Sequence, residues 1–242
     1  MTVGRDDVVQ LLRQAIASGA HPVGSKLPSE RELAERHGVS RSVVREALRT
    51  LSEQGFITIE PARGAFVRES RPTDAAPVVG LVLRRSGVTA REVIVARRVI
   101  EGENAALAAL ARTADDLGHM REALDDFANA PTLLDEIAAD LALHTAVAAA
   151  SGNQVLEAMF GSVAGFAAEI MLRSLGDPVV TDLAVPQHRQ IVDAIEAHDA
   201  DAARELMVRH IDVAQQHYGA DLDRPLEAVA RGRLADFLER LG

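Results

Sequence analysis

One aspartate and three histidines have a spacing that could bind a metal ion. Asp140 and His144 are four residues apart, so a helix would place both side chains on one face. Two later segments with helical spacing carry His188 and His210. One carboxylate and three imidazoles from three helices suit a divalent ion such as zinc, nickel or manganese. Water or the carboxylate of a small ligand would fill the remaining coordination positions.

The spacing alone leaves other readings of these residues open. The chain has eight histidines, and a single histidine on a helix is usually exposed or hydrogen-bonded. His217, two turns after His210, fits the spacing equally well. A bound metal could also be purely structural, or it could activate water in an enzyme. For the enzyme, Glu136 lies one turn before Asp140 as a candidate base, but the sequence has no nucleophile motif or phosphate-binding loop.

A second group of residues suggests contact with DNA. A predicted helix opens with Ser40, Arg41 and Ser42, and Arg45 lies four residues after Arg41, on the same face. Arginine forms bidentate contacts with guanine and charge-assisted contacts with phosphate, and serine suits phosphate. Arg31 begins the preceding helix. The alternative is an ordinary helical domain with solvated arginines.

The elements around these arginines follow the order of a winged helix-turn-helix. Apolar spacing predicts a helix over residues 5–18, and Ser29 with Glu32 forms a capping box that starts a short helix, which Gly38 ends. The arginine-bearing helix follows and ends at Gly55. Residues 56–60 and 65–68 then predict two strands of a hairpin. Arg63 and Gly64 mark its turn, where a small residue would let the backbone approach the minor groove of DNA.

The rest of the chain predicts an all-helical second domain. Two prolines and small polar residues at 69–77 indicate a linker. Beyond residue 78, Ala- and Leu-rich amphipathic segments alternate with short breaks. They predict an antiparallel bundle of six or seven helices. The tail from Pro225 to Gly242 predicts one more helix. The fold class is therefore mainly α, with one small wing.

Composition and charge limit the function further. The chain of 242 residues has no cysteine, which excludes disulfides and thiolate metal sites, and only 3 % aromatic residues. The net charge of −10 is uneven: residues 1–70 carry about +1 and the remainder about −11. A near-neutral domain binds DNA when its arginines share one face. We find no secretory signal and no run near the roughly 18 apolar residues of a membrane span, so we expect a cytoplasmic protein without a membrane partner.

The first domain resembles the DNA-binding domain of the GntR family. The resemblance is carried without a gap by LPSERELAERHGVSRSVVREALRTLSEQGFITIEPARGAFV. It implies that Arg31, Arg41, Arg45 and Gly64 contact operator DNA, with Ser40 and Ser42 beside them. It also implies a homodimer on a short palindrome. A dimer is expected independently, because one such module makes too few base contacts for genomic specificity.

The second domain resembles the all-helical FCD effector domain of the FadR subfamily of GntR regulators. The matching stretches are VARRVIEGENAALAA, DLALHTAVAAASGN, PQHRQIVDAIEAHD and ADAARELMVRHI. In many such domains a metal binds at positions that match Asp140, His144, His188 and His210, which favours His210 over His217. Members that lack this set use a different pocket. For this chain we expect a divalent ion, zinc first, with nickel or manganese as alternatives.

The resemblance also implies a ligand. The effectors of the family are mostly small organic acids, and Arg97 matches a position where the family often has an arginine facing the pocket. Arg173 and Asn153 are further candidates for effector binding, while Glu101 matches a structural position. An acid would ligate the ion directly and be clamped by arginine at its other end.

We therefore expect a DNA-binding transcriptional regulator, not an enzyme. Repression is the commoner outcome in the family. The expected division is a DNA-binding domain over 1–70, a linker over 71–77, a ligand-binding bundle over 78–222 and an extra helix over 223–242.

Overall fold

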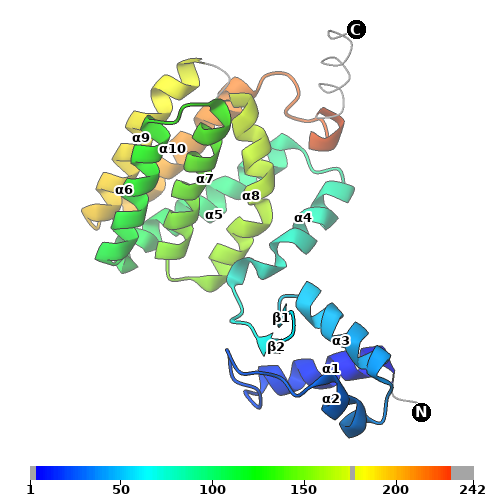
Figure 1. Ribbon diagram of the computed structural model, residues 1–242. Helices are drawn as coiled ribbons and strands as arrows, with labels where there is room; N and C mark the ends of the chain where they lie inside the picture. The colour runs from blue at the N-terminus through cyan, green and yellow to red at the C-terminus, as the bar shows by residue number, and fades with distance from the viewer. Residues whose placement is uncertain (1–3, 175–177, 230–242) are drawn as a thin grey trace. The chain divides into compact units, whose positions relative to one another are not determined.

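The computed structural model describes residues 4–174 and 178–229 (Figure 1). The chain divides after Asp74 into two compact units, and each is described here by itself. Residues 175–177 and most of the predicted tail beyond Pro225 lie outside the described part.

The first unit is a helix-turn-helix with a two-stranded wing, as the sequence predicted. Its elements are α1 (Arg5–Ala17), α2 (Glu30–His37), α3 (Arg41–Glu53), β1 (Ile57–Glu60) and β2 (Gly64–Val67). The strands are antiparallel, with Ile57 opposite Val67 and Glu60 opposite Gly64. The sheet has these two strands and no others in the described residues.

Short polar residues fix the ends of α2 and α3. The Ser29 hydroxyl accepts the Glu32 N–H at 3.3 Å, while the Glu32 carboxylate accepts the Ser29 N–H at 2.8 Å. Gly38 ends α2 in the left-handed region at φ 66°, which glycine adopts without steric cost. Ser40 then caps α3 by accepting the Val43 N–H. The predicted capping box and stop are therefore confirmed.

Packing of α3 decides which of its side chains face outward. Val44, Ala47, Leu48 and Leu51 are buried in the core of the first unit. Because this apolar stripe faces inward, Arg41 and Arg45 on the other side are exposed, at 64 % and 63 % of the side chain.

The second unit contains seven α-helices in its described residues. They are α4 (Ala76–Arg85), α5 (Ala90–Ala111), α6 (Ala114–Ala128), α7 (Leu133–Ala150), α8 (Gln154–Ser174), α9 (Pro178–Glu196) and α10 (Ala200–Tyr218). A short 3₁₀ turn, Pro72–Ala75, leads directly into α4. The first helix thus starts inside the segment predicted as a linker. Pro77 permits this, because the first turn of a helix needs no N–H donor there.

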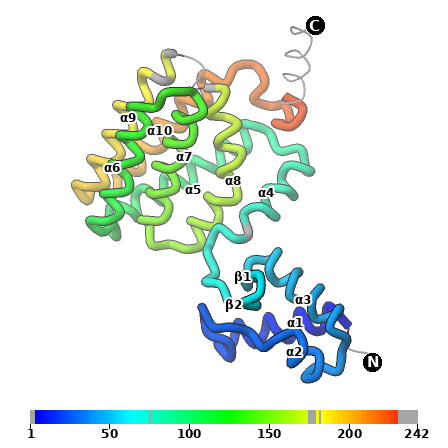
Figure 2. Tube along the Cα trace, viewed as in Figure 1, coloured from blue at the N-terminus to red at the C-terminus, as the bar shows by residue number. Residues whose placement is uncertain are grey.

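The long helix α5 forms the centre of the bundle. It contacts α7, α8, α9 and α10, and it buries twelve of its residues, from Ala90 to Ala109. In Figure 2 the trace of α6 runs beside α7 and that of α9 beside α10, and these pairs are in contact. Three polar side chains of α5 are buried with the apolar ones: Arg97, Glu101 and Asn104.

Helix α8 corrects the expectation that no segment approaches the length and apolarity of a membrane span. Residues 154–173 have a mean hydropathy of 1.6, so by length and composition this helix could cross a membrane. The sequence did not show this as an apolar run, because Glu157 and Glu169 interrupt it. In the bundle α8 packs against α4, α5, α7 and α10, with Phe160, Phe166 and Ile170 buried. A core helix passes the same test of length and hydropathy.

The described part of the tail packs on the start of α5. The Leu226 N–H donates to the Val88 carbonyl at 3.0 Å, and Arg91 pairs with Asp223 at 2.6 Å. A helical turn begins at Leu226. The predicted helix over 223–242 otherwise lies outside the described residues.

Candidate DNA interface and metal centre

The N-terminal end of α3 presents hydroxyl and guanidinium groups together. The hydroxyls of Ser40 and Ser42 lie 2.8 Å apart. Arg41 and Arg45 project from the same exposed face, as their spacing predicted. In a helix-turn-helix the residues at this end of the second helix reach base edges in the major groove.

Glu30, at the start of α2, contacts Arg41 and Arg45 of α3. Its carboxylate accepts two hydrogen bonds from Arg45, from Nε at 2.9 Å and from Nη2 at 2.8 Å. Nη2 of Arg41 lies 3.6 Å from the same carboxylate. The hydrogen bonds from Arg45 lower the pKa of Glu30 and raise the pKa of Arg45. A bidentate pair of this kind fixes the plane of the guanidinium.

A cleft of about 860 Å³ lies between the start of α3 and the wing. Its lining includes six cationic side chains: Lys26, Arg31, Arg41, Arg45, Arg49 and Arg63. Glu30 and Glu60 are the acidic side chains in this lining. A concave surface with this balance of charge attracts a phosphate backbone.

At the tip of the wing, the backbone of Gly64 lies close to the side chain of Lys26. A Cβ atom on Gly64 would meet Cε of the flexible Lys26 side chain at 2.8 Å, and φ of Gly64 is 113°, a backbone conformation that strains any other residue. Arg63 pairs with Glu60 and lies over the ring of Phe66. Arg31, in contrast, projects into solvent and makes an exposed pair with Glu35 at 3.1 Å.

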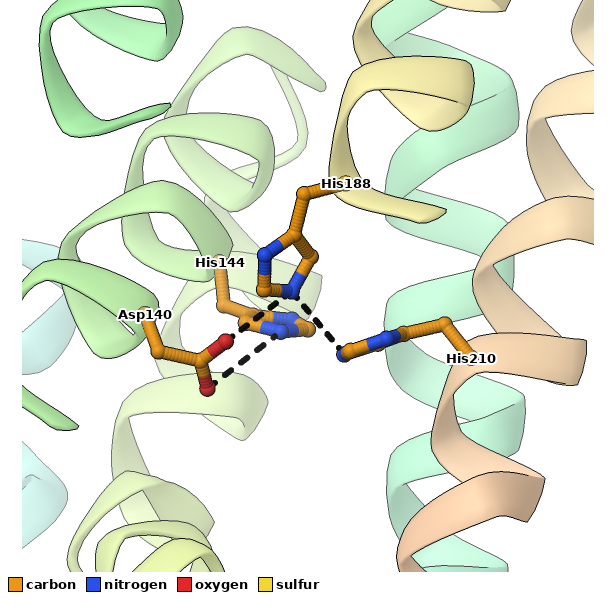
Figure 3. Close-up of side chains that lie close together, drawn as sticks. All are labelled: Asp140, His144, His188 and His210. Carbon is orange, nitrogen blue, oxygen red and sulfur yellow. Dashed lines mark hydrogen bonds and ion pairs between the residues drawn. The ribbon is translucent and has the colours of Figure 1, made fainter. Parts of the chain in front are cut away.

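In the second unit, four predicted metal ligands converge. Figure 3 shows Asp140 and His144 on α7, His188 on α9 and His210 on α10 pointing toward one another. One ligand atom from each lies within 4.8 Å of all the others. Asp140, His144 and His188 are buried, and His210 is partly buried. His217, the alternative by spacing, is not part of this group.

The distances test whether the group fits an ion. Nε2 of His188 lies 2.9 Å from Oδ1 of Asp140 and 3.1 Å from Nε2 of His210, and Nε2 of His144 lies 3.9 Å from Oδ2 of Asp140. Zinc ligands at about 2.0–2.2 Å from the ion lie roughly 3–3.5 Å from their neighbours. Nε2 of His144 is buried without a hydrogen-bond partner among the described residues. The four side chains could therefore hold a divalent metal after small movements.

Two further side chains orient the histidines. Glu101 on α5 contacts Nδ1 of His144 and is itself paired with Arg97. Oε1 of Gln187 lies 3.2 Å from Nδ1 of His210. The hydrogen bond at Nδ1 of His210 leaves the lone pair of its Nε2 free for a metal, and the Glu101 carboxylate beside Nδ1 of His144 favours the same orientation there.

Ionisation in this buried group also suits metal binding. Burial opposes the charge on Asp140, but the neighbouring His188 outweighs it, so the pKa of Asp140 is lowered. Burial likewise opposes the charge on Glu101, yet Arg97 and His144 lower its pKa to about 2. Burial, then the charges of His188 and His144, hold the pKa of His210 well below its usual value. The carboxylates are thus ionised and His210 is neutral, the forms that bind metal.

A small cavity of about 20 Å³ adjoins the group. Its polar lining is Arg97, Asp140, Gln187 and His210. The other predicted effector residues lie elsewhere: Arg173 pairs with Asp221 at 3.0 Å and covers the ring of Tyr218, and Asn153 caps α8. Their predicted role in effector binding has no support from this geometry. Glu136, the candidate base, does not line the cavity.

Sequence patterns did not identify four residues that the structure adds to the DNA cleft and the metal centre. Arg49 lies one turn after Arg45, so its spacing was a usable signal, and Lys26 is close to Gly64 only through the fold. Glu30 and Gln187 are adjacent to predicted site residues, but no spacing connects them with the arginine or histidine that they contact.

Comparisons with known families identify both units. The model described as "Bacterial regulatory proteins, gntR family" matches residues 5–67, and the model described as "FCD domain" matches residues 92–213, half of the chain. The second match contains all four predicted metal ligands.

Known relatives cover almost the whole chain. The Uxu operon regulator of Haemophilus influenzae is 30 % identical over 84 % of this chain and 77 % of its own length. The galactonate operon transcriptional repressor of Escherichia coli is 29 % identical over 85 % of this chain and 93 % of its own. A solved structure, Streptococcus agalactiae GntR, shares the fold, with a TM-score of 0.66, 24 % identity and coverage of 88 % and 99 %.

These relatives are regulators of transcription and not enzymes, which confirms the expectation for this chain. The chain belongs to the GntR family of bacterial transcriptional regulators, with the FCD domain of its FadR-type members.

Proposed function

We propose that this regulator represses transcription by binding a short palindromic operator as a homodimer, and that a small organic acid at the metal centre alters this binding. The observation that carries the proposal is the convergence of Asp140, His144, His188 and His210 beside a cavity that Arg97 lines. The regulator would act in the cytoplasm, where its operator DNA is.

The DNA contacts are assigned to the cleft of the first unit. Arg41 and Arg45 read base edges, and Ser40, Ser42 and Arg31 contact phosphate. Arg63 and Gly64 carry the wing toward the minor groove. Support comes from the exposure of these side chains and from the excess of cationic groups in the cleft. A homodimer follows from the few bases that one α3 reaches.

The effector site is assigned to the cavity of the second unit. Asp140 and the three histidines would hold a divalent ion, zinc first and nickel or manganese as alternatives. Such an ion supplies an open coordination position that attracts a carboxylate. Arg97 would bind the same acid through its guanidinium, since it lines the cavity while paired with Glu101. The Escherichia coli relative, named for a galactonate operon, supports a carboxylate as effector.

The acid must favour one arrangement of the dimer to change operator binding. The site draws side chains from α5, α7, α9 and α10, so a bound acid can change how these helices pack. The division of the chain at 1–70, 71–77 and 78–222 is part of the proposal.

Metal analysis and operator binding test the proposal together. Protein loaded with zinc should hold one ion per chain, and the double variant His144→Ala with His210→Ala should hold none. A small acid should change operator affinity only for the loaded native protein. A purely structural ion gives a different result: its removal lowers the melting temperature but leaves affinity for small acids unchanged.

A further inference from the structure

The described side chains that line the cavity beside the metal centre form a polar group and an apolar group, named here the polar side and the apolar side. The polar side is formed by Arg97, Asp140, Gln187 and His210. The apolar side consists of the other described lining side chains, which are aliphatic and belong to α8, α9 and α10: Met171, Val180, Ala184, Ile211, Val213 and Ala214. Most of the apolar side belongs to a hydrophobic cluster that also contains Phe127.

The polar side chains of the lining are all engaged with polar partners. Arg97 pairs with Glu101, Asp140 contacts His188, and Gln187 contacts His210. They can receive one carboxylate and a neighbouring oxygen atom of a ligand. Among the side chains that the structure describes, the lining has no further hydroxyl, amide or charged group for a ligand that carries more oxygen atoms along its length.

A hydroxyl group placed against the apolar side would lose its hydrogen bonds to water and gain none. Aliphatic pockets reject a ligand of the same shape with one added hydroxyl by about 100-fold. A ligand with several hydroxyls on its chain would incur this penalty more than once. The apolar side therefore separates acids by the polarity of their chains.

The small volume of the cavity also favours a short acid. The cavity of about 20 Å³ is far below the roughly 300–1,000 Å³ of pockets for larger ligands. Met171 is a flexible side chain that can move to admit a short alkyl group. Ala184 and Ala214 leave no long side chain to displace. The cavity has room for about one water molecule, so every acid requires repacking of the lining, and a short acid requires less of it than a six-carbon sugar acid.

We propose that this cavity selects a short 2-hydroxy or 2-oxo monocarboxylic acid with an unsubstituted alkyl chain, and that it rejects polyhydroxylated sugar acids. The inference rests on the proposed function, because it takes the acid head to lie at Arg97 and the metal ligands. It separates this chain from the relative named for galactonate, itself a sugar acid.

Two acids of equal length test this selection. 2-Hydroxybutanoate and 2,3,4-trihydroxybutanoate share four carbons, the carboxylate and the 2-hydroxyl, and differ only in hydroxyls on the chain. Calorimetric titration of the zinc-loaded full chain should show at least tenfold tighter binding of 2-hydroxybutanoate. Equal affinity, or tighter binding of the trihydroxy acid, would overturn the inference and leave the proposed function standing. Binding of neither acid would also overturn the inference, and the metal analysis and operator binding described above would then decide the proposed function separately.

A matched pair of variants assigns the selection to the apolar side. Val213→Thr places a hydroxyl on the cavity lining with little change of shape, so the preference for 2-hydroxybutanoate should fall at least threefold. Val208→Thr is the control, because Val208 on the same helix lies against Gly102 and not in the cavity. Melting curves of both variants establish that they are folded. An unchanged preference in folded Val213→Thr would contradict the assignment.

Discussion

Nδ1 of His144 contacts the carboxylate of Glu101, and both residues are only 2 % exposed. Glu101 lies on α5 and His144 on α7, so the contact joins the central helix to the helix that carries two metal ligands. The same carboxylate accepts a hydrogen bond from Nε of Arg97 at 2.5 Å. The metal centre and the candidate effector arginine are therefore connected through one buried glutamate.

Glu101→Gln should weaken metal binding about 10- to 100-fold, the usual loss when the partner of a ligating histidine is changed. Glutamine keeps the shape of the side chain but removes the charge that orients His144. Glu103→Gln is the control, because Glu103 on the same helix makes a partly exposed pair with Arg204. A competition titration with a zinc chelator measures both variants, and equal zinc affinity of native protein and Glu101→Gln would refute the role of Glu101.

Zinc should raise the melting temperature of the native protein, because an ion that binds only the folded chain stabilises it by about 2.7 kcal/mol at a concentration 100 times its Kd. His144→Ala should abolish this rise. His119→Ala, which changes an exposed histidine of α6, should retain it. Scanning calorimetry with and without zinc measures the effect, and an undiminished rise in His144→Ala would show that the ion binds elsewhere.

Arg45→Ala should weaken operator binding by about 1–3 kcal/mol without lowering the melting temperature, because Arg45 is exposed and its change leaves the core intact. Arg36→Ala removes the same charge from an exposed position of α2 that does not line the cleft. Fluorescence anisotropy at one salt concentration compares them. If Arg36→Ala and Arg45→Ala lose equal affinity, Arg45 contributes only bulk charge.

Glu30→Gln should raise affinity for DNA of unrelated sequence and reduce the preference for the operator. It frees the guanidinium of Arg45 from its bidentate pair and removes one negative charge from the cleft. Glu53→Gln makes the same charge change at the exposed end of α3. The measured quantity is the ratio of operator affinity to affinity for unrelated DNA, and a ratio that falls equally in both variants would contradict a positioning role for Glu30.

The ion pair between Glu30 and Arg45 also sets the pH range over which Glu30→Gln should change DNA binding. The pKa of Glu30 is lowered, so its charge is present at neutral pH and is lost only as the pH falls through the lowered value. The difference between native protein and Glu30→Gln should therefore stay constant from roughly pH 6 to 8. A difference that disappears within this range would show that another group titrates.

Much of the fold could be predicted because local signals were strong. Ser29 with Glu32, Gly38 and Ser40 defined α2 and α3, and helical spacing placed the four metal ligands on three helices. The start of α4 was misplaced, because two prolines and small residues suggested a linker while Pro77 is tolerated in a first helical turn. The apolar character of α8 was missed because two glutamates interrupt it.

The parts that sequence did not reveal depend on contacts between distant segments. Glu30 meets Arg45 only because α2 crosses α3, and Gln187 meets His210 only because α9 packs on α10. The family resemblance favoured Arg97 as an effector residue and left Arg173 as a weaker candidate. Packing separates them, since Arg97 lines the cavity while Arg173 pairs with Asp221.

Operator binding measured against acid concentration is the most direct test of an acid-responsive repressor with a metal-anchored site. Zinc-loaded native protein should lose operator affinity, by fluorescence anisotropy, as 2-hydroxybutanoate is added, and the His144→Ala, His210→Ala variant should bind the operator at every acid concentration without change. An identical response of the two proteins, or no response of the native protein to any short acid, would contradict the proposed function.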